Sequence, residues 1–304
     1  MTERNAFLVA ALTSISWGLT GIFVRLLPGL SPLTITAVRL IIGLVAVLPF
    51  LVIFCDTRLG LKAALAHPVA YVLALLLTGY YLLATAAFQL APVAEVALLI
   101  STTPLFVLAL RWVQGNPPAR SEIAGALLAI GGMALILAPK MSFSGTTSTP
   151  LAHHLYGDSC ALGAAALAAF YASTYRALSE QGRAPEASGV SALTFAIGSV
   201  ILISMLALTQ TPTGLTDLTG NSLLVFLGLG VLSTAVPTFG FAVASKRLPA
   251  IVTATISLFV PLFSGLFAFL ILGETISLLF VAGSLLVLGG VAMIIRQSRA
   301  TNPA

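Results

Sequence analysis

The sequence predicts an all-α polytopic membrane protein with about ten transmembrane helices, arranged as two inverted five-helix repeats. Three features predict this fold: the composition, a series of long apolar runs, and an internal repeat. Hydrophobic residues make up 59% of the 304 positions and charged residues 8%, against roughly 45–50% and about 25% in a soluble domain. So few charges cannot cover a water-soluble surface, and little chain is left for a soluble catalytic domain.

Apolar runs between polar or Gly- and Pro-rich breaks mark the expected helices, each near the ~20 residues that cross the ~30 Å hydrocarbon core. The run that begins at Ala6 has no small-residue cleavage site after a short apolar core, so we expect it to be retained as a helix. In chain order the expected helices are 6–27, 33–54, 68–89, 93–112, 121–138, 157–178, 187–208, 221–244, 250–272 and 276–296.

The polar stretch from Pro139 to Tyr156, rich in Ser and Thr, divides these helices five and five. We therefore expect a first repeat over residues 1–138, an external linker over 139–156, and a second repeat with a short cytoplasmic tail over 157–304.

The internal repeat appears when the two halves are aligned. Pro92 matches Pro249 and Pro104 matches Pro261 at one offset, and Leu-Phe follows the second proline in both halves. With one inserted residue, the glycines match as well: Gly115 with Gly273, Gly125 with Gly283, and Gly132 with Gly290. Because each repeat has an odd number of spans, the second repeat enters the bilayer in the opposite orientation. Transporters use this architecture, with the substrate site near mid-membrane between the halves.

The positions of Lys and Arg predict the orientation of the chain. If the N-terminus is inside, eleven of the fourteen Lys and Arg are cytoplasmic, and the others are Arg25, Arg39 and Lys140. We therefore expect an integral protein of a bacterial cytoplasmic (inner) membrane with both termini cytoplasmic. The cations are spread over short loops, so the net charge of +5 reflects topology and predicts no nucleic-acid partner.

Several motifs give the chain a family resemblance. They are Ser16-Trp17-Gly18, Ala91-Pro92 with Pro104, Leu248-Pro249 with Pro261, and Leu272-Gly273-Glu274. Through them nearly the whole chain resembles the EamA-type ten-helix members of the drug/metabolite transporter superfamily. The first half departs from the pattern, with Asn116 where a Glu is common. The resemblance implies export or exchange of metabolites, amino acids or drugs by alternating access. Together with the few charges in the spans, it predicts an exporter or exchanger of amino acids or similar zwitterionic or cationic metabolites, with multidrug efflux as the alternative.

Polar and aromatic residues at helical spacing predict the faces that line the solute path. The alternatives are that Ser and Thr bond their own helices and that the aromatic residues form an interfacial belt. The expected path residues are Trp17, Thr20, Thr78, Tyr80, Tyr81, Thr85, Thr102, Tyr171, Tyr175, Thr238, Phe241 and Ser257, together with the charged Arg39 and Glu95.

The two charged members of this set carry alternatives of their own. Arg39 could meet an anionic group or snorkel to the interface, and Glu95 could simply favour a helix N-terminus. Since only Arg39 among the cations lies well within a span, we expect solutes that are not strongly anionic.

Pro104 and Pro261 are expected to act as hinges that free the carbonyls of Ile100 and Ser257, or else to fix packing kinks. Gly125 with Gly132, and Gly283 with Gly290, are each seven residues apart and predict close helix packing.

A membrane-embedded enzyme is the rival from another class. His67 lies at the start of an expected helix and His153-His154 in the linker, so no triad or ligand cluster is expected within the spans. We therefore expect no enzyme, no cofactor and no metal. The expected partners are a small-molecule solute and the lipid bilayer; a homodimer and a passive channel stay open as options.

Overall fold

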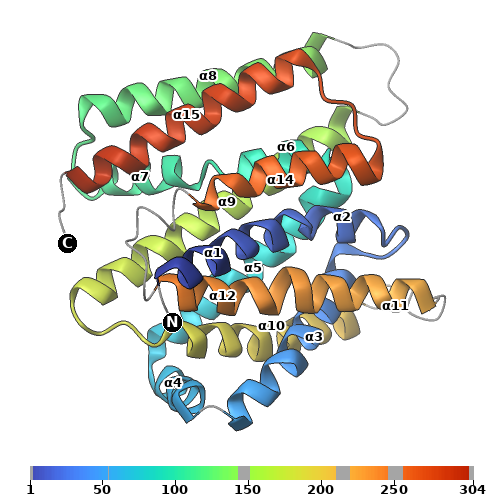
Figure 1. The fold of residues 1–304 in the computed structure, drawn as a ribbon, viewed down its shortest axis with the longest axis vertical. Helices are drawn as coiled ribbons and strands as arrows, with labels where there is room; N and C mark the ends of the chain where they lie inside the picture. Colours follow the sequence, from blue (N-terminus) through green and yellow to red (C-terminus); the bar gives the residue numbers. More distant parts are fainter. Residues whose placement is uncertain (1–2, 54, 143–150, 210–219, 246–255, 301–304) are drawn as a thin grey trace.

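The computed structural model describes residues 3–53, 55–142, 151–209, 220–245 and 256–300. These residues form helices, with no strand among them (Figure 1). The elements of the first half are α1 (Glu3–Gly18), α2 (Thr20–Arg25), α3 (Pro32–Ile53), α4 (Cys55–Ala66), α5 (Pro68–Leu90), α6 (Val93–Ile100), α7 (Thr103–Val113) and α8 (Arg120–Ser142). Those of the second half are α9 (Leu151–Glu180), α10 (Ala187–Thr209), α11 (Gly220–Leu227), η2 (Gly228–Ala235), α12 (Val236–Ser245), α14 (Phe259–Phe267), η3 (Ala268–Leu272) and α15 (Leu278–Ala300).

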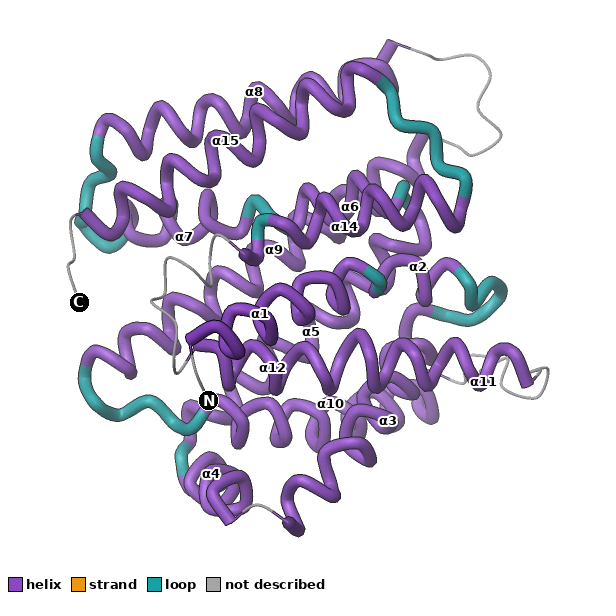
Figure 2. The backbone as a smooth tube through the Cα atoms, in the orientation of Figure 1, coloured by secondary structure: helices purple, strands orange, loops and turns teal. Residues whose placement is uncertain are grey.

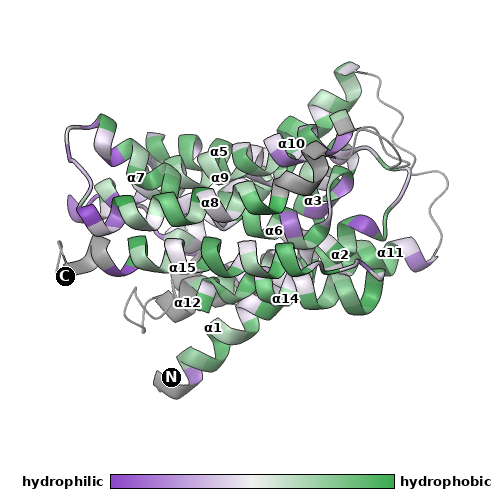
Figure 3. Cartoon of the chain, turned by 90° about the horizontal axis from the view of Figure 1, so that it is seen from above, coloured by the Kyte–Doolittle hydropathy of each residue, from purple (hydrophilic) through white to green (hydrophobic). Residues whose placement is uncertain are grey.

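Long apolar helices make the chain a polytopic membrane protein. Within the described residues, eight helices are long and apolar enough to cross a membrane, and Phe259–Leu272 is a shorter apolar helix. Residues 250–255 of the expected helix 250–272 lie outside the described residues. Hydrophobic colour runs along the middles of the helices, and most of the hydrophilic colour gathers near their ends (Figure 3). The all-helical membrane class is confirmed, whereas the number ten and the inversion of the repeats stay predictions.

Several expected spans are interrupted. The first breaks at Leu19, between α1 and α2, and the fourth breaks at Ser101 and Thr102, between α6 and α7. The eighth contains the π-helix η2, and the ninth ends in the π-helix η3. Such interruptions expose backbone groups and often mark functional places in a helix.

The short helix α4 was not expected. It has 12 residues, too few to cross a bilayer, and its polar residues at 56, 58 and 62 suggested a loop. Figure 2 shows α4 nearly end-on, so it lies across the direction of its neighbours. Its Gly60 meets Gly189 of α10 so closely that a Cβ at Gly189 would collide with the Gly60 carbonyl.

The expected linker is shorter than the sequence suggested. Helix α8 continues to Ser142 and α9 begins at Leu151, so both helices extend into the range 139–156. Residues 143–150 of this range lie outside the described residues.

The helices pack mainly between the two halves of the chain. Helix α8 lies along α15, at the top of Figure 1, and α3 packs on α10. Helix α5 packs on α9 and α10, α1 packs on α12 and α14, and α6 packs on α9 and α14. The largest buried cluster accordingly joins Ile22, Val96 and Leu99 of the first half to Ala164 and Phe226 of the second.

Candidate functional site

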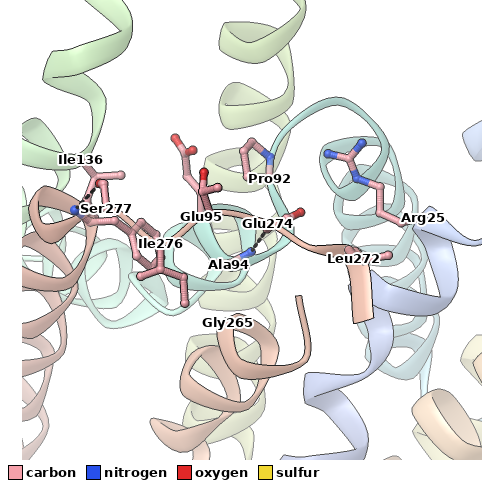
Figure 4. A pocket seen from close by; sticks show the side chains of 12 residues that line it. Arg25, Pro92, Ala94, Glu95, Ile136, Gly265, Leu272, Glu274, Ile276 and Ser277 are labelled. Carbon is pink, nitrogen blue, oxygen red and sulfur yellow. Dashed lines mark hydrogen bonds between the residues drawn. The ribbon is translucent and has the colours of Figure 1, made fainter. Parts of the chain in front are cut away.

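A cavity of about 670 Å³ lies where the halves meet at one end of the helices (Figure 4). In the predicted topology this is the external end, because α2, α5 and α14 with η3 finish there and α6 and α15 begin there. Its lining includes Arg25, Pro92, Ala94, Glu95, Ile136, Gly265, Leu272, Glu274, Ser277 and Phe280. The first half and the second half both contribute to its wall.

Glu274 joins the two halves beside this cavity. Its Oε1 accepts a hydrogen bond from the backbone N–H of Val93 at 2.9 Å, and its Oε2 accepts one from Ala94 at 3.4 Å. A carboxylate at a helix N-terminus satisfies N–H groups that have no partner inside the helix and complements the helix dipole. Gly273 has a φ of 67°, so the chain turns sharply just before Glu274.

Arg25 holds the neighbouring corner of the first half. Its Nη2 donates to the carbonyl of Ala91, at the end of α5, at 2.8 Å. Its Nε is buried and has no hydrogen-bond partner within the described part of the chain. The connection between α5 and α6, Ala91 and Pro92, is therefore bonded to the Arg25 guanidinium before it and is followed by two N–H groups that bond to the Glu274 carboxylate.

Glu95 brings a second carboxylate to the cavity. It lies in the first turn of α6 and is only 4% exposed. Figure 4 shows Arg25 and Glu95 on either side of Glu274. The wall thus carries both signs of charge within a small volume.

Arg39 is the centre of a second polar cluster, buried between the halves. Its side chain is 2% exposed, its Nε donates to Thr234 Oγ1 at 2.6 Å, and its Nη2 donates to the Ser233 carbonyl at 3.3 Å. The guanidinium carbon lies 4.6 Å from the centre of the Tyr81 ring, a cation–π distance. Thr20 extends the cluster, because its hydroxyl lies 2.9 Å from that of Ser233.

This cluster also holds the π-helix of the eighth span. Thr234 lies in η2 and donates its hydroxyl proton to the carbonyl of Leu229, five residues earlier, at 2.7 Å. Arg39 in turn donates to the oxygen of that hydroxyl. Arg39 therefore does not snorkel to the interface but fixes the seam between α3 and η2.

The expected aromatic residues lie in three close pairs, and their place along one solute path stays a prediction. Trp17 lies 5.4 Å from Phe241, Tyr80 lies 5.5 Å from Tyr81, and Tyr171 stacks on Tyr175 at 5.9 Å, as measured between ring centres. The last two pairs belong to different packing clusters. The Tyr175 hydroxyl also donates to the Pro185 carbonyl at 2.9 Å, which ties the end of α9 to the start of α10.

Most of the expected path hydroxyls bond their own helices. Each of these donates to a carbonyl three or four residues earlier, as Ser and Thr commonly do. The bonds are Thr78 to Ala74, Thr85 to Tyr81, Thr102 to Leu99, and Thr238 to Thr234. Ser257 is half-buried, next to the break at Leu258.

The prediction that Pro104 leaves the Ile100 carbonyl free is wrong. Pro104 removes its helical partner, but the Thr103 hydroxyl donates to it at 2.8 Å. Both proline helices are nevertheless interrupted at matching places, at Ser101 and Thr102 before Pro104, and at Leu258 before Pro261. The break lies two to three residues before the proline in each half.

The four paired glycines pack α8 against α15. A Cβ at Gly132 would lie 2.6 Å from the Gly283 carbonyl, and one at Gly125 would lie 2.6 Å from the Gly290 carbonyl. The reverse contacts are equally close. The two glycine pairs therefore face each other across a seam within the chain.

The comparison with known families decides what kind of protein carries this site. A model of the EamA-like transporter family matches residues 4–138 and again residues 155–296. The chain belongs to this family.

Two curated relatives of this EamA-like transporter are themselves named as transporters. An uncharacterized transporter of Archaeoglobus fulgidus is 26% identical over 290 residues, which cover 94% of either chain. The uncharacterized transporter YwfM of Bacillus subtilis is 29% identical over 269 residues, covering 86% of this chain and 83% of YwfM. A protein crystal structure, 18% identical, superposes with a TM-score of 0.66 over 99% of this chain and 100% of the other, which shows a shared fold. The protein is therefore a membrane transporter.

The sequence did not identify two residues of this EamA-like transporter that line its cavity. Arg25 was placed only as an outer helix end, and Glu274 only as part of a family motif. The glycine before Glu274 could have indicated a left-handed turn at the end of a helix. The contact of Glu274 with α6 could not have been found in this way, because the two are 180 residues apart in sequence. Among the described residues, no group of three or more His, Cys, Asp or Glu side chains is placed to hold a metal ion.

Proposed function

We propose that this EamA-like transporter carries small zwitterionic solutes, with amino acids as the leading class, by alternating access and mainly in the export direction. The observation that supports this most is the cavity at the junction of the halves, which presents a guanidinium and two carboxylates. Its volume of about 670 Å³ falls within the roughly 300–1,000 Å³ of small-molecule sites. Alternating access is reversible and gives no direction by itself, so we take the export direction from the family resemblance.

The charges of the cavity favour some solutes over others. A zwitterion can place its ammonium group near Glu95 and its carboxylate near Arg25, whose Nε has no partner among the described residues. A sugar phosphate or other polyanion would meet two carboxylates against one guanidinium. A lipophilic cation is the second candidate, because the same two carboxylates would attract it.

Arg39 supports a solute that carries a carboxylate. Within the described part of the chain, its hydrogen-bond partners are a hydroxyl and a carbonyl, and a ring lies beside it, so each is neutral. A buried guanidinium within a membrane span is costly, and such residues usually serve a function. We propose that it meets the solute carboxylate as the solute passes between the halves.

The helix contacts support alternating access between two inverted repeats. In the expected repeat, the helices of the first half correspond to those of the second as follows: α1 to α9, α3 to α10, α5 to α12, α6 to α14, and α8 to α15. The contact of α5 with α9 then has its counterpart in the contact of α12 with α1, and the contact of α6 with α9 in that of α14 with α1. Three further contacts join corresponding helices directly: α8 with α15, α3 with α10, and α6 with α14. This pattern is the one expected when helices 1–5 and 6–10 are related by a half-turn.

The test is a ligand screen by thermal stability in detergent. Because a ligand that binds only the folded state raises the unfolding midpoint, zwitterionic amino acids should raise it as their concentration rises. Sugar phosphates should not. Stabilisation by lipophilic cations alone would favour the second candidate, and stabilisation by phosphate esters without any amino acid would overturn the proposal. Glu95→Gln should weaken the response to amino acids, whereas Arg120→Gln, at the far end of α8, should not.

A further inference from the structure

The hydrogen bonds of Glu274 connect parts of the chain that must move relative to each other if the halves alternate. Glu274 follows η3 and precedes α15, both in the second half, while Val93 and Ala94 begin α6 in the first half. The carboxylate accepts from both N–H groups, so it caps a helix that it does not belong to. An ordinary capping residue lies in its own helix terminus.

We propose that Glu274 is a positioning residue, an outer latch whose carboxylate holds the second half to the α6 N-terminus and favours the state with the outer end of the cavity closed. This proposal rests on the alternating-access mechanism proposed above. When η3 and α15 move away from α6, both hydrogen bonds must break. The latch then contributes to the equilibrium between the two states through its two hydrogen bonds to α6.

The surroundings of Glu274 make the latch specific. Gly273 takes a φ of 67°, which turns the chain so that Glu274 follows directly after η3. Arg25 donates to the Ala91 carbonyl, so the segment between α5 and α6 is also held from within the first half. Gly265 of α14 lies beneath and is buried, and a Cβ there would meet the Ala94 Cβ at 3.6 Å.

The first half has no matching latch among the described residues. Asn116 occupies the position that corresponds to Glu274, and it is exposed. The nearby carboxylate of Glu122 accepts from Arg111 and from the Ala119 N–H, both in its own half. Within the described residues the carboxylate latch therefore acts at the outer end, where it biases the resting state toward closure.

The experiment measures the state of the outer end without any solute. In a background with Cys55→Ser and Cys160→Ser, Gly265→Cys supplies a thiol on the cavity wall. Its rate of reaction with a membrane-impermeant maleimide, added outside right-side-out vesicles, reports how often the cavity opens outward. Glu274→Gln should raise this rate about 5- to 30-fold, the factor expected when a charged cap of this kind is lost.

Ser31→Ala is the matched control. Ser31 precedes α3 at the same end of the molecule and is not part of the cavity lining, and its Oγ accepts from Thr34 N–H of its own helix, at 3.0 Å. Removing that cap should leave the labelling rate within twofold of the parent. Glu274→Asp keeps the charge on a shorter side chain that cannot reach both amides, so its rate should lie between those of the parent and Glu274→Gln.

Two outcomes would overturn the latch. One is a labelling rate in Glu274→Gln equal to that of the parent, and the other is an equal increase in Ser31→Ala. If Glu274→Gln does not fold, Glu274→Asp decides the matter, because it must still label faster than the parent. Since no solute is present, failure here is distinct from failure of the ligand screen.

Discussion

At the scale of single residues, Arg39 is a cation buried within a membrane span, where a charge is costly. A charge at 2% exposure inside a membrane span survives only because every contact compensates its lost hydration. Here the compensation comes from Thr234, the Ser233 carbonyl and the Tyr81 ring. None of these groups carries a negative charge, so the positive charge of the guanidinium is not neutralised by them; this is why we propose that it meets a solute carboxylate.

Replacing Arg39 therefore tests both its roles. Arg39→Gln should lower solute counterflow at least about tenfold, while Arg39→Lys, which keeps a charge but not the planar fork, should retain an intermediate rate. Both variants lose the hydrogen bonds to η2, so the unfolding midpoint should fall in both. Equal counterflow in Gln and Lys variants, each matching the parent, would remove Arg39 from the solute path.

Glu122 gives a second prediction at this scale. It is 1% exposed, and its carboxylate accepts from Arg111 Nη1 at 2.9 Å and from Ala119 N–H at 2.8 Å. Glu122→Ala should reduce the free energy of unfolding by about 2–4 kcal/mol, because a partly buried guanidinium and the N–H of the residue before α8 both lose their bond to this carboxylate.

The exposed pair Arg176 and Glu180 is the matched control for Glu122. Their side chains are 52% and 62% exposed at an N–O distance of 2.8 Å. Glu180→Ala should cost less than about 0.5 kcal/mol. Unfolding measured in parallel in one detergent compares the two, and similar losses would contradict the burial argument.

At the scale of elements, the glycine seam between α8 and α15 makes a sharp prediction. Gly132→Ala places a Cβ 2.6 Å from the Gly283 carbonyl and should destabilise by about 1–3 kcal/mol. The adjacent Gly131 has nothing within 4 Å of a built Cβ, so Gly131→Ala should stabilise by about 0.5–1 kcal/mol through helix propensity. Opposite signs in the unfolding midpoints are the expected result, and equal signs would contradict the seam.

The sequence predicted the long elements better than their details. Apolar runs identified α5, α10 and α15 within a few residues, because hydrophobic length dominates in a bilayer. Helix α4 was not predicted, because a short helix with several charged residues has the same composition as a polar loop. The Ile100 carbonyl was misjudged because the rescuing hydroxyl of Thr103 depends on a local rotamer.

The candidate site was predictable only in part, for a similar reason. Repeat-related Pro and Gly positions, Arg39 and Glu95 stand out in the sequence. The contact of Glu274 with α6 and the contact of Arg39 with η2 join residues some 180 to 195 positions apart. No periodicity in a single sequence encodes such pairings, which follow from how the halves dock.

At the scale of the whole molecule, orientation is the first prediction. Ser148→Cys, in the expected external linker, should react with an impermeant maleimide outside intact cells, and Lys62→Cys of α4 should react only after permeabilisation. This result is expected because most Lys and Arg lie in the loops and termini on the side of Lys62, the expected cytoplasmic side. The reverse labelling pattern would invert the topology and place the Glu274 latch at the cytoplasmic end.

Counterflow in reconstituted vesicles decides whether a small zwitterion crosses between the halves by a carrier mechanism. Vesicles loaded with an unlabelled neutral amino acid should accumulate the labelled form transiently, with saturation, and Arg39→Gln should reduce that accumulation about tenfold. A channel cannot produce such an overshoot. Linear, non-saturating equilibration of amino acids, or robust counterflow of sugar phosphates without any of amino acids, would contradict the account.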